Sequence, residues 1–335
     1  MNLSVVKSLN QGLAELMAQD PSIILLGEDL VDPYGGAFKV TKGLSTRYPD
    51  RVISTPMSEA AITGVSAGLA MRGLRPIMEV MFGDFLTLCT DQIVNHIAKY
   101  RWMYNDQMSL PWILRTPMGG RRGYGPTHSQ TLEKLFCGIP GLRIVAVNRL
   151  YEPAQLLRKC VEIAQPVLFI ENKMLYPLPR HESTDGLVMG GEIKWSEKKF
   201  PTATVSWTHF EEADVTAVAY GGMSDLLLEA ARQLMEEDEI AIDVVVPTHI
   251  KPFDLAPLVA SVSRSGRLAV FEEGMESWGW GREVIYQVLQ KCPEIAGHCR
   301  ARGSREFPIG NAKTLEDATL LQVSDVKSVL RELAI

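Results

Sequence analysis

The sequence predicts an α/β protein with two domains, each built on a mainly parallel sheet flanked by helices. Its length of 335 residues suits two domains of ordinary size. Short apolar runs alternate with helical patterns, and this alternation lapses once, between about residues 177 and 210. Such alternation is typical of parallel sheets that helices cover on both faces. We therefore expect a first domain over residues 1–180, a linker over 181–210 and a second domain over 211–335.

The expected elements follow from the apolar periodicity along the chain. In the first domain, strands are expected at residues 22–26, 76–81, 112–115, 143–147 and 167–170, and helices at 58–72, 84–100 and 152–164. In the second domain, strands at 215–219, 242–246 and 268–271 alternate with helices at 225–236, 255–263 and 283–290. A hairpin around residues 189–195 is expected inside the linker.

The composition excludes several functional classes. A net charge of −6 provides no basic excess to neutralise phosphates, so we expect no nucleic-acid partner. No apolar run approaches the ~20 residues that span a bilayer, and the N-terminus lacks the features of a signal peptide. Five scattered cysteines form no disulfide framework, which favours a cytoplasmic protein. Cys292, His298 and Cys299 lack a fourth ligand, so buried small residues are favoured over a metal site there.

The helix expected from Ser58 carries an unusual stripe of small residues, with Ala60, Gly64 and Gly68 four residues apart. Each glycine inside a helix costs about 1 kcal/mol relative to alanine, so a compensating contact is expected. The stripe would let another backbone approach closely. That backbone could belong to another subunit or to the protein's own sheet, and the stripe alone does not decide between them.

Two segments of the first domain contain candidate site residues, each with a structural alternative. In the segment 55–59, Ser58 suits the N-cap of a helix and Glu59 its first turn, which is sufficient to explain both. The segment 79–85 ends a strand and enters a helix, and ligands of open α/β sheets collect at such strand ends. Aromatic residues such as Phe85 more often belong to a core there.

The third segment is the glycine-rich run from Gly119 to Gly125, followed by His128 and then a helix. Four glycines in seven residues cannot form regular structure, so this run is a mobile loop or one that another group approaches closely. A lone histidine is usually structural. A histidine that follows such a loop is a better candidate for acid–base chemistry.

Taken together, these segments resemble the beta subunits of the 2-oxoacid dehydrogenases (pyruvate, branched-chain 2-oxoacid and acetoin types) of the transketolase-like superfamily. The resemblance covers nearly the whole chain, and its strength lies in the succession of motifs. The matching stretches are residues 34–38, 41–44, 51–52, 55–59, 73–76, 91–95, 98–100, 128–130, 132–133, 139–142, 166–167 and 171–173, with 250–254 and 270–274 in the second domain. The resemblance implies a transketolase-like pyrimidine-binding domain followed by a transketolase C-terminal-like domain.

The family's cofactor is thiamine diphosphate, and the resemblance assigns roles to five residues. Glu59 matches the glutamate that protonates N1′ of the aminopyrimidine, so that the neighbouring amino group can act as a base. Phe85 stands where an aromatic ring stacks on the aminopyrimidine, with Met57 contacting that ring through its backbone and Met81 at the edge. His128 matches the histidine that exchanges a proton with the incoming acyl acceptor.

The resemblance also implies partners. In the family, an alpha subunit binds the diphosphate through magnesium, with a Gly-Asp-Gly signature that does not occur in this sequence. We therefore expect activity only with an alpha subunit, in an assembly of two alpha and two beta chains. The second domain would support dimerisation and docking of a lipoyl acyltransferase or another acyl carrier.

Departures from the family pattern leave alternatives open. Residues 102–106 replace a common Gly-Gly, Ile163 replaces an acidic ligand for a structural potassium ion in some relatives, and residues 300–321 match poorly. Arg121 and Arg122 add charge beside the expected site. The reaction could therefore be carboligation or acyl transfer to a carrier protein in a biosynthetic pathway, which a neighbouring carrier-protein gene would favour. A non-catalytic scaffold for the alpha subunit would be favoured by loss of Glu59 or His128, and both are present.

Overall fold

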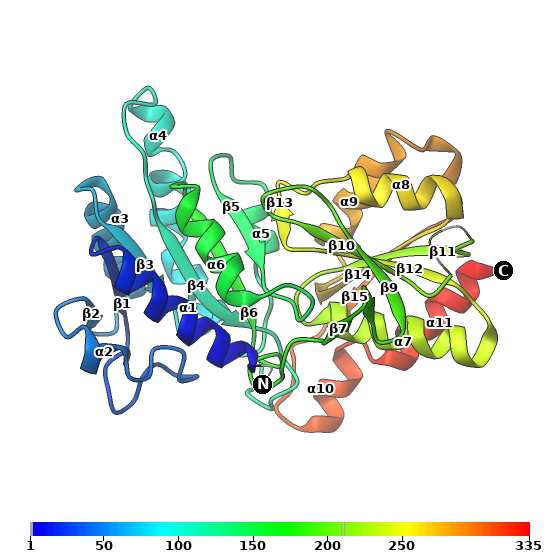
Figure 1. Cartoon of the computed structure of the whole chain (residues 1–335), viewed down its shortest axis with the longest axis horizontal. Helices are drawn as coiled ribbons and strands as arrows, with labels where there is room; N and C mark the ends of the chain where they lie inside the picture. The colour runs from blue at the N-terminus through cyan, green and yellow to red at the C-terminus, as the bar shows by residue number, and fades with distance from the viewer. Residues whose placement is uncertain (1–2, 209, 211) are drawn as a thin grey trace. The chain divides into compact units, whose positions relative to one another are not determined.

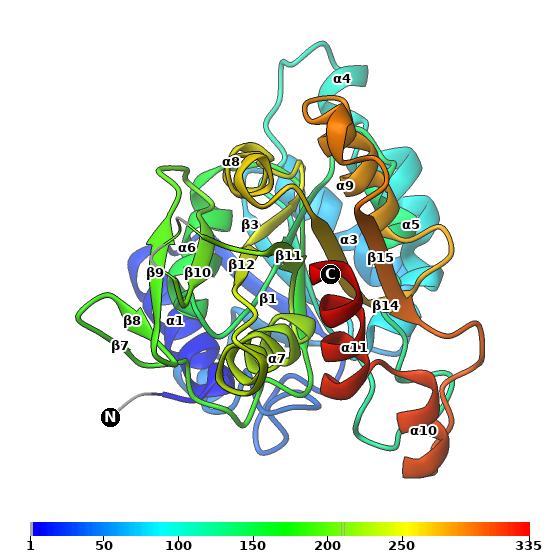
Figure 2. The same ribbon diagram turned by 90° about the vertical axis from the view of Figure 1, so that its right-hand side faces the viewer.

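The structure is a computed structural model that describes residues 3–208, 210 and 212–335. The chain forms two compact units. The first comprises Met1–Gly119, Thr127–Val147 and Tyr151–Arg180, and the second Gly120–Pro126, Asn148–Leu150 and His181–Ile335. Each unit contains a sheet between two layers of helices, so the expected α/β class is found in both (Figures 1 and 2).

The first unit is built on parallel strands in the order β5-β6-β4-β3-β1-β2. The strands are β1 (Ile23–Gly27), β2 (Val52–Ser54), β3 (Arg75–Glu79), β4 (Ile113–Met118), β5 (Arg143–Ala146) and β6 (Val167–Asn172). Every residue of β1, β4 and β6 is buried, which explains why these strands read as continuous apolar runs.

Helices cover both faces of this sheet. Helices α1 (Val5–Gln19) and α6 (Pro153–Glu162) lie side by side on one face, and α3 (Glu59–Met71) lies on the other (Figures 1 and 2). Shorter helical segments are α2 (Leu44–Arg47), a 3₁₀ helix η1 (Gly83–Cys89), a π-helix η2 (Gln92–Ile97), α4 (Tyr100–Met103) and α5 (Lys134–Cys137). Candidate residues sit in connections that follow β2, β3 and β4.

The single helix expected at residues 84–100 is instead divided into η1, η2 and α4. Its apolar residues Leu86, Cys89, Ile93 and Ile97 are all buried. Their spacing of three or four residues places them on one face, which explains the expectation of a helix. That spacing does not distinguish α-helical hydrogen bonding from 3₁₀ or π bonding.

The second unit contains a mixed sheet in the order β15-β14-β11-β12-β10-β9-β8-β7. Strands β11 (Val215–Ala219), β12 (Ile242–Pro247), β14 (Leu268–Met275) and β15 (Cys299–Ser304) are parallel. Helices α7 (Met223–Asp238) and α11 (Val323–Ala334) cover one face, and α8 (Ala256–Ser265) and α9 (Trp280–Leu289) cover the other (Figures 1 and 2). The remaining elements are β13 (His249–Lys251), the 3₁₀ helix η3 (Pro293–Ile295) and α10 (Lys313–Thr319).

The segment 181–210, expected as a linker, differs from that expectation. It contains β7 (Ser183–Thr184), β8 (Leu187–Val188), β9 (Gly191–Trp195) and β10 (Thr202–Ser206), which extend the second sheet in antiparallel fashion. The pair β8–β9 is the hairpin expected around residues 189–195. Antiparallel strands at a sheet edge can be polar on one face, which gave this segment the composition of a linker.

Candidate active site

Helix α3 presents its first residue, Glu59, at the end of the connection from β2. Ser58 occupies the N-cap position, but its side chain forms no capping hydrogen bond with any described residue. Ser58 therefore stands at the N-cap position without capping the helix through its side chain. Glu59 is half-buried, and the side chain of Met57 is 86% exposed. An acidic side chain and an exposed thioether thus flank the start of α3.

Glu28, which the sequence reasoning overlooked, lies close enough to Glu59 to interact with it electrostatically. Burial, and then repulsion from Glu59 and Asp29, raise the pKa of the Glu28 carboxyl above its ordinary value, against a hydrogen bond from the Ser58 backbone. Its Oε1 atom is buried and has no hydrogen-bond partner in the described part of the chain. Glu28 directly follows the buried strand β1, and this position at the carboxyl end of a strand could have marked it as a site residue in the sequence.

Phe82, Phe85 and His128 form a cluster of rings. The centre of the His128 ring lies 4.7 Å from that of Phe82 and 5.2 Å from that of Phe85, and both pairs are edge-to-face. Phe85 remains half-exposed, so one part of its ring is available to a ligand. The structure therefore brings two residues from separate sequence motifs, Phe85 and His128, into contact.

Hydrogen bonds also join the segment that contains Phe85 to the segment that contains His128. Asp84 is buried, and its Oδ1 atom accepts hydrogen bonds from the backbone N–H of Gln130 at 3.2 Å and from the Gln130 side chain at 2.8 Å. Because Asp84 and Gln130 adjoin Phe85 and His128 closely in sequence, these bonds fix the positions of both backbones. Met81, the fifth expected residue, is half-buried two residues beyond the end of β3.

His128 is also held from its backbone and its ring. Lys173 is fully buried, and its ammonium group donates a hydrogen bond to the His128 carbonyl. The same ammonium group lies 5.0 Å from the centre of the Phe82 ring. The Thr127 hydroxyl lies 3.0 Å from Nδ1 of His128. With Nδ1 engaged, Nε2 is the ring atom available for proton exchange.

A buried ion-pair network joins three adjacent strands of the first unit. The Arg115 guanidinium on β4 contacts Glu79 of β3 at 2.9 Å and binds both oxygens of Glu171 on β6 at 2.7 and 2.8 Å. The Tyr176 hydroxyl donates to Glu171 at 2.6 Å. Burial raises the pKa of Glu79 above its ordinary value, against the opposing effect of Arg115. This network joins the adjacent strands β3, β4 and β6, and candidate residues stand in the connections that follow β3 and β4.

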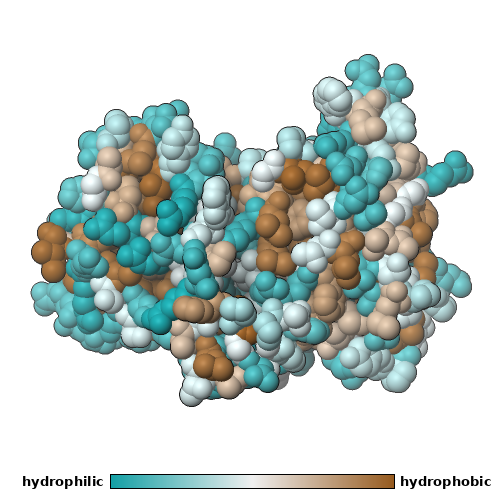
Figure 3. Space-filling view, turned by 180° about the vertical axis from the view of Figure 1, so that it is seen from behind, coloured by the Kyte–Doolittle hydropathy of each residue, from teal (hydrophilic) through white to brown (hydrophobic). Residues whose placement is uncertain are grey.

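The small-residue stripe of α3 faces outward. A Cβ atom built on Gly64 or Gly68 would meet nothing within 4 Å among the described residues. Val65, between them, is 59% exposed. Figure 3, which views the side of the first unit on which α3 lies, shows hydrophobic residues at the surface. Of the two alternatives for this stripe, close packing on its own sheet is therefore not observed.

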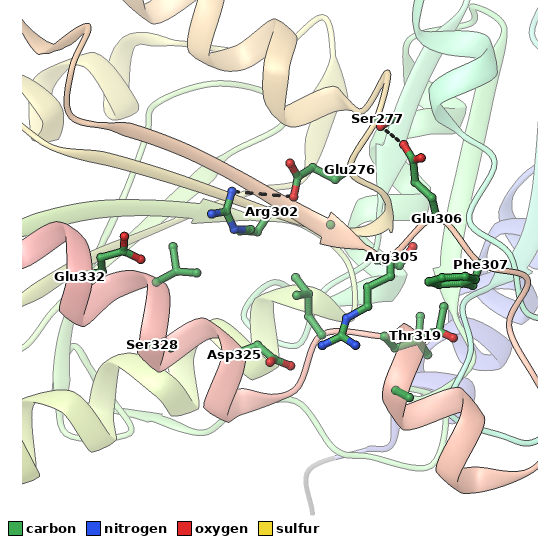
Figure 4. Close-up of a pocket in the computed structure, with 16 residues that line it drawn as sticks. Glu276, Ser277, Arg302, Arg305, Glu306, Phe307, Thr319, Asp325, Ser328 and Glu332 are labelled. Carbon is green, nitrogen blue, oxygen red and sulfur yellow. Dashed lines mark hydrogen bonds and ion pairs between the residues drawn. The ribbon is translucent and has the colours of Figure 1, made fainter.

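The second unit contains a separate hollow of about 620 Å³, between β14, β15 and α11. Figure 4 shows Arg302 beside Glu276, and Ser277 beside Glu306, on its wall. Its charged lining comprises two arginines and four carboxylates, Arg302, Arg305, Glu276, Glu306, Asp325 and Glu332. This excess of negative charge does not suit a diphosphate.

The described residues contain neither a metal-binding cluster nor a membrane-spanning helix. Within residues 3–208, 210 and 212–335, no three His, Cys, Asp or Glu side chains are grouped to hold a metal ion. In the same residues, no helix is long and apolar enough to cross a membrane.

The fold and this site define a protein of the transketolase type. Residues 1–179 match the family described as transketolase, pyrimidine binding domain, and residues 208–326 match transketolase, C-terminal domain. A solved split-gene transketolase, titled an inactive beta4 tetramer, shares the fold with a TM-score of 0.74 at 22% identity, covering 100% of this chain and 99% of that chain. The transketolase from Leishmania mexicana has a TM-score of 0.68 at 17% identity, covering 99% of this chain and 46% of that one.

Similarity in sequence identifies the family within this type. Pyruvate dehydrogenase E1 component subunit beta-1 of Oryza sativa subsp. japonica is 33% identical over 97% of this chain and 84% of its own length. A Cupriavidus necator acetoin:2,6-dichlorophenolindophenol oxidoreductase subunit beta is 32% identical over 98% and 97%. The 2-oxoisovalerate dehydrogenase subunit beta of Bacillus subtilis is 31% identical over 99% and 98%. The chain belongs to the family of 2-oxoacid dehydrogenase E1 beta subunits, as its sequence motifs indicate.

Proposed function

We propose that this chain, together with an alpha subunit, decarboxylates a 2-oxoacid and transfers the acyl group to a lipoyl-type acceptor. The observation that carries the proposal is the contact between Phe85 and His128 in a chain that resembles E1 beta subunits along almost its entire length. Relatives named for pyruvate, acetoin and 2-oxoisovalerate are 33%, 32% and 31% identical, so identity does not select one substrate.

The residues present fit the aminopyrimidine half of thiamine diphosphate. Glu59 offers a half-buried carboxylate, Phe85 a partly exposed ring, and Met57 an exposed position whose backbone a flat heterocycle could reach. The unpartnered oxygen of Glu28 is the kind of buried polar atom that a ligand or a proton satisfies. We assign Glu59 to the ring nitrogen N1′, Phe85 to stacking on the ring, the backbone of Met57 to contact with the same ring, and Met81 to its edge.

When bound, thiamine diphosphate supplies the electron sink for decarboxylation. The chain's own residues hold and move protons around it. Glu59 holds a proton at N1′. Burial and repulsion from Glu59 raise the pKa of Glu28, so Glu28 resists becoming a second negative charge beside Glu59. His128, with Nδ1 beside Thr127, gives or takes a proton at Nε2 for the acyl acceptor.

The diphosphate and its magnesium ion are assigned to the alpha subunit. This chain lacks the Gly-Asp-Gly signature, and the hollow in its second unit carries more carboxylates than guanidinium groups. The outward stripe at Gly64 and Gly68 supports a partner subunit, because a Cβ atom on either glycine would meet no described residue within 4 Å. We expect that stripe to pack against another subunit of an assembly with two alpha and two beta chains.

The test is calorimetric titration of thiamine diphosphate with magnesium. It compares this chain alone with the same chain co-purified with the product of a neighbouring alpha-subunit gene. Binding only by the assembled sample is expected, and a screen of 2-oxoacids with lipoyl and carrier-protein acceptors then identifies the substrate. Tight binding by this chain alone would show that the diphosphate site is here, and would overturn the assignment to the partner.

A further inference from the structure

The glycine-rich segment Gly120–Pro126, which leads to His128, is anchored within the second unit. The backbone N–H of Gly120 donates to the carboxylate of Glu273, at the end of β14, at 2.7 Å. The guanidinium group of Arg121 donates to the carbonyl of Leu321, between α10 and α11. These contacts tie Arg121 to the second unit through neutral acceptors, while its Nε atom has no hydrogen-bond partner among the described residues.

The third anchor is the carboxylate of Glu316 on α10. It accepts hydrogen bonds from the backbone N–H groups of Arg122 at 3.2 Å and Gly123 at 3.3 and 3.4 Å. Glu316 is only 3% exposed and forms no ion pair with any lysine or arginine of the described residues. A buried carboxylate requires such donors, so Glu316 and the segment stabilise each other.

The glycines permit this close approach. A Cβ atom on Gly120 would lie 2.6 Å from Cδ1 of Leu320 and 3.3 Å from Oε1 of Glu316. Gly123 has a φ of +69°, and a Cβ atom there would lie 3.2 Å from the Asn311 carbonyl. The sequence left open whether the glycines provide mobility or close approach, and at these two positions the structure shows close approach.

We propose that Glu316 is a positioning residue for the acyl-transfer half of the reaction, an inference that rests on the proposed function. Four residues lie between Gly123 and His128, so their Cα atoms can be at most about 17 Å apart, and displacement of the segment is transmitted to the histidine. The Lys173 and Thr127 contacts hold His128 at its carbonyl and ring. Glu316 sets the path by which the backbone reaches these contacts.

Limited trypsin digestion of the folded chain tests the anchor without any cofactor or partner, because Arg121 and Arg122 lie in the segment. We expect Glu316→Ala to speed cleavage after these arginines at least about tenfold, and Glu316→Gln, which keeps one acceptor oxygen, to have a smaller effect. Gly123→Ala should act like Glu316→Ala, because alanine is strained at a φ of +69° and its Cβ would lie 3.2 Å from the Asn311 backbone carbonyl, while Glu316 stays intact.

Glu272→Gln is the matched control. Glu272 is also a buried carboxylate of the second unit, and it accepts the backbone N–H groups of Trp280 at 3.1 Å and Gly281 at 2.9 Å. Its substitution should lower the melting temperature without speeding cleavage after Arg121 or Arg122. Cleavage that is as slow in Glu316→Ala and Gly123→Ala as in the wild type would overturn the proposal.

Kinetics of the enzyme assembled with the alpha subunit separate positioning from general stability. Glu316→Ala should leave decarboxylation with an artificial electron acceptor within about threefold of wild type, and lower acyl transfer about 10- to 100-fold. Equal losses in both assays would reduce Glu316 to a structural role and overturn the proposal. If the wild type shows neither activity, the proposed function fails, and the digestion result alone decides whether Glu316 anchors the segment.

Discussion

Lys173 donates a hydrogen bond from its buried ammonium group to the backbone carbonyl of His128. The same group lies over the ring of Phe82, which packs edge-to-face against the His128 ring. A single cation thus restrains the histidine from two directions. We expect a residue in this position to affect catalysis through the orientation of His128 rather than through contact with substrate.

Lys173→Met should therefore weaken acyl transfer and shift its pH profile, because His128 loses the donor at its carbonyl. The lost hydrogen bond should also lower the free energy of unfolding by about 1–3 kcal/mol. Stopped assays over pH 5.5–8.5 and urea unfolding measure the two effects. Lys194→Met is the control, because the Lys194 side chain is exposed, although its ammonium group lies 3.9 Å from the ring of the buried Phe210, and its loss should change stability by less than about 0.5 kcal/mol. An unchanged pH profile for Lys173→Met would contradict the orienting role.

Glu59→Gln should lower decarboxylation by the assembled enzyme about 10²- to 10⁴-fold, because the amide cannot exchange a proton with N1′. Binding of thiamine diphosphate should persist, since the side chain keeps its size and one acceptor. Single-turnover decarboxylation and calorimetry separate the two effects. Intact decarboxylation in this variant would show that Glu59 does not activate the cofactor.

His128→Ala should separate the two halves of the reaction. Decarboxylation measured with an artificial electron acceptor should be largely retained, whereas transfer to a lipoyl domain should fall about 10²-fold or more. The cavity left beside Phe82 and Phe85 provides a second readout, because added imidazole should restore part of the transfer. Retention of both activities would remove His128 from the mechanism.

Glu28→Gln should make the isolated chain more stable at neutral pH. The pKa of Glu28 is raised above its ordinary value of 4.5, so the folded chain binds this proton more tightly than the unfolded chain does. Stability from this group is therefore present below about pH 4.5 and lost as the pH rises through the folded-state pKa. Urea unfolding at several pH values should show the variant and wild type converging in acid.

Glu229→Gln should change the free energy of unfolding in the opposite direction and serves as a comparison. Hydrogen bonding from Arg232 lowers the pKa of Glu229, so wild-type stability from that group increases as the pH rises. The Glu229 variant should therefore be slightly less stable than wild type at neutral pH. A Glu28→Gln variant that behaved in the same way would show that Glu28 is not destabilised by its surroundings.

Two glycines of the first unit, the closely packed Gly83 and the surface residue Gly64, should respond to alanine in opposite ways. A Cβ atom on Gly83 would lie 2.3 Å from Cγ of Met118, so Gly83→Ala should destabilise the chain by about 1–3 kcal/mol. Gly64→Ala, in open space on α3, should stabilise the isolated chain by about 1 kcal/mol through helix propensity. The same Gly64 variant should assemble poorly with the alpha subunit in size-exclusion chromatography. Normal assembly would argue against α3 as an interface.

Much of this fold could be predicted because its central strands are buried on both faces. Strands such as β4 and β6 therefore appear as apolar runs, and their order along the chain indicates parallel pairing. Of the strands β7–β10, only the hairpin of β8 and β9 was expected; β7 and β10 were assigned to the linker, because they belong to an antiparallel edge whose composition is that of a loop. The 3₁₀ and π segments at residues 83–97 share the apolar spacing of an α-helix and differ only in hydrogen bonding.

The candidate site was predictable only where residues adjoin one another in a motif. Glu59 and His128 stand in such motifs. Glu28, Phe82 and Lys173 were not singled out, although Phe82 and Lys173 lie within recognised stretches, because their roles depend on which strand ends meet in space. The anchoring of Gly120–Pro126 by Glu316 joins residues almost 200 positions apart, and the spacing of apolar residues carries no information about such a pair.

The antiparallel pairing of β10 with β12 has a practical consequence for dissecting this protein. A fragment that began at residue 208, where the match to the C-terminal domain family starts, would lack β7–β10. Strand β12, whose six residues are all buried, would then become an unprotected edge with free N–H and C=O groups. Such a fragment should aggregate, whereas one that began near His181 would keep its edge covered.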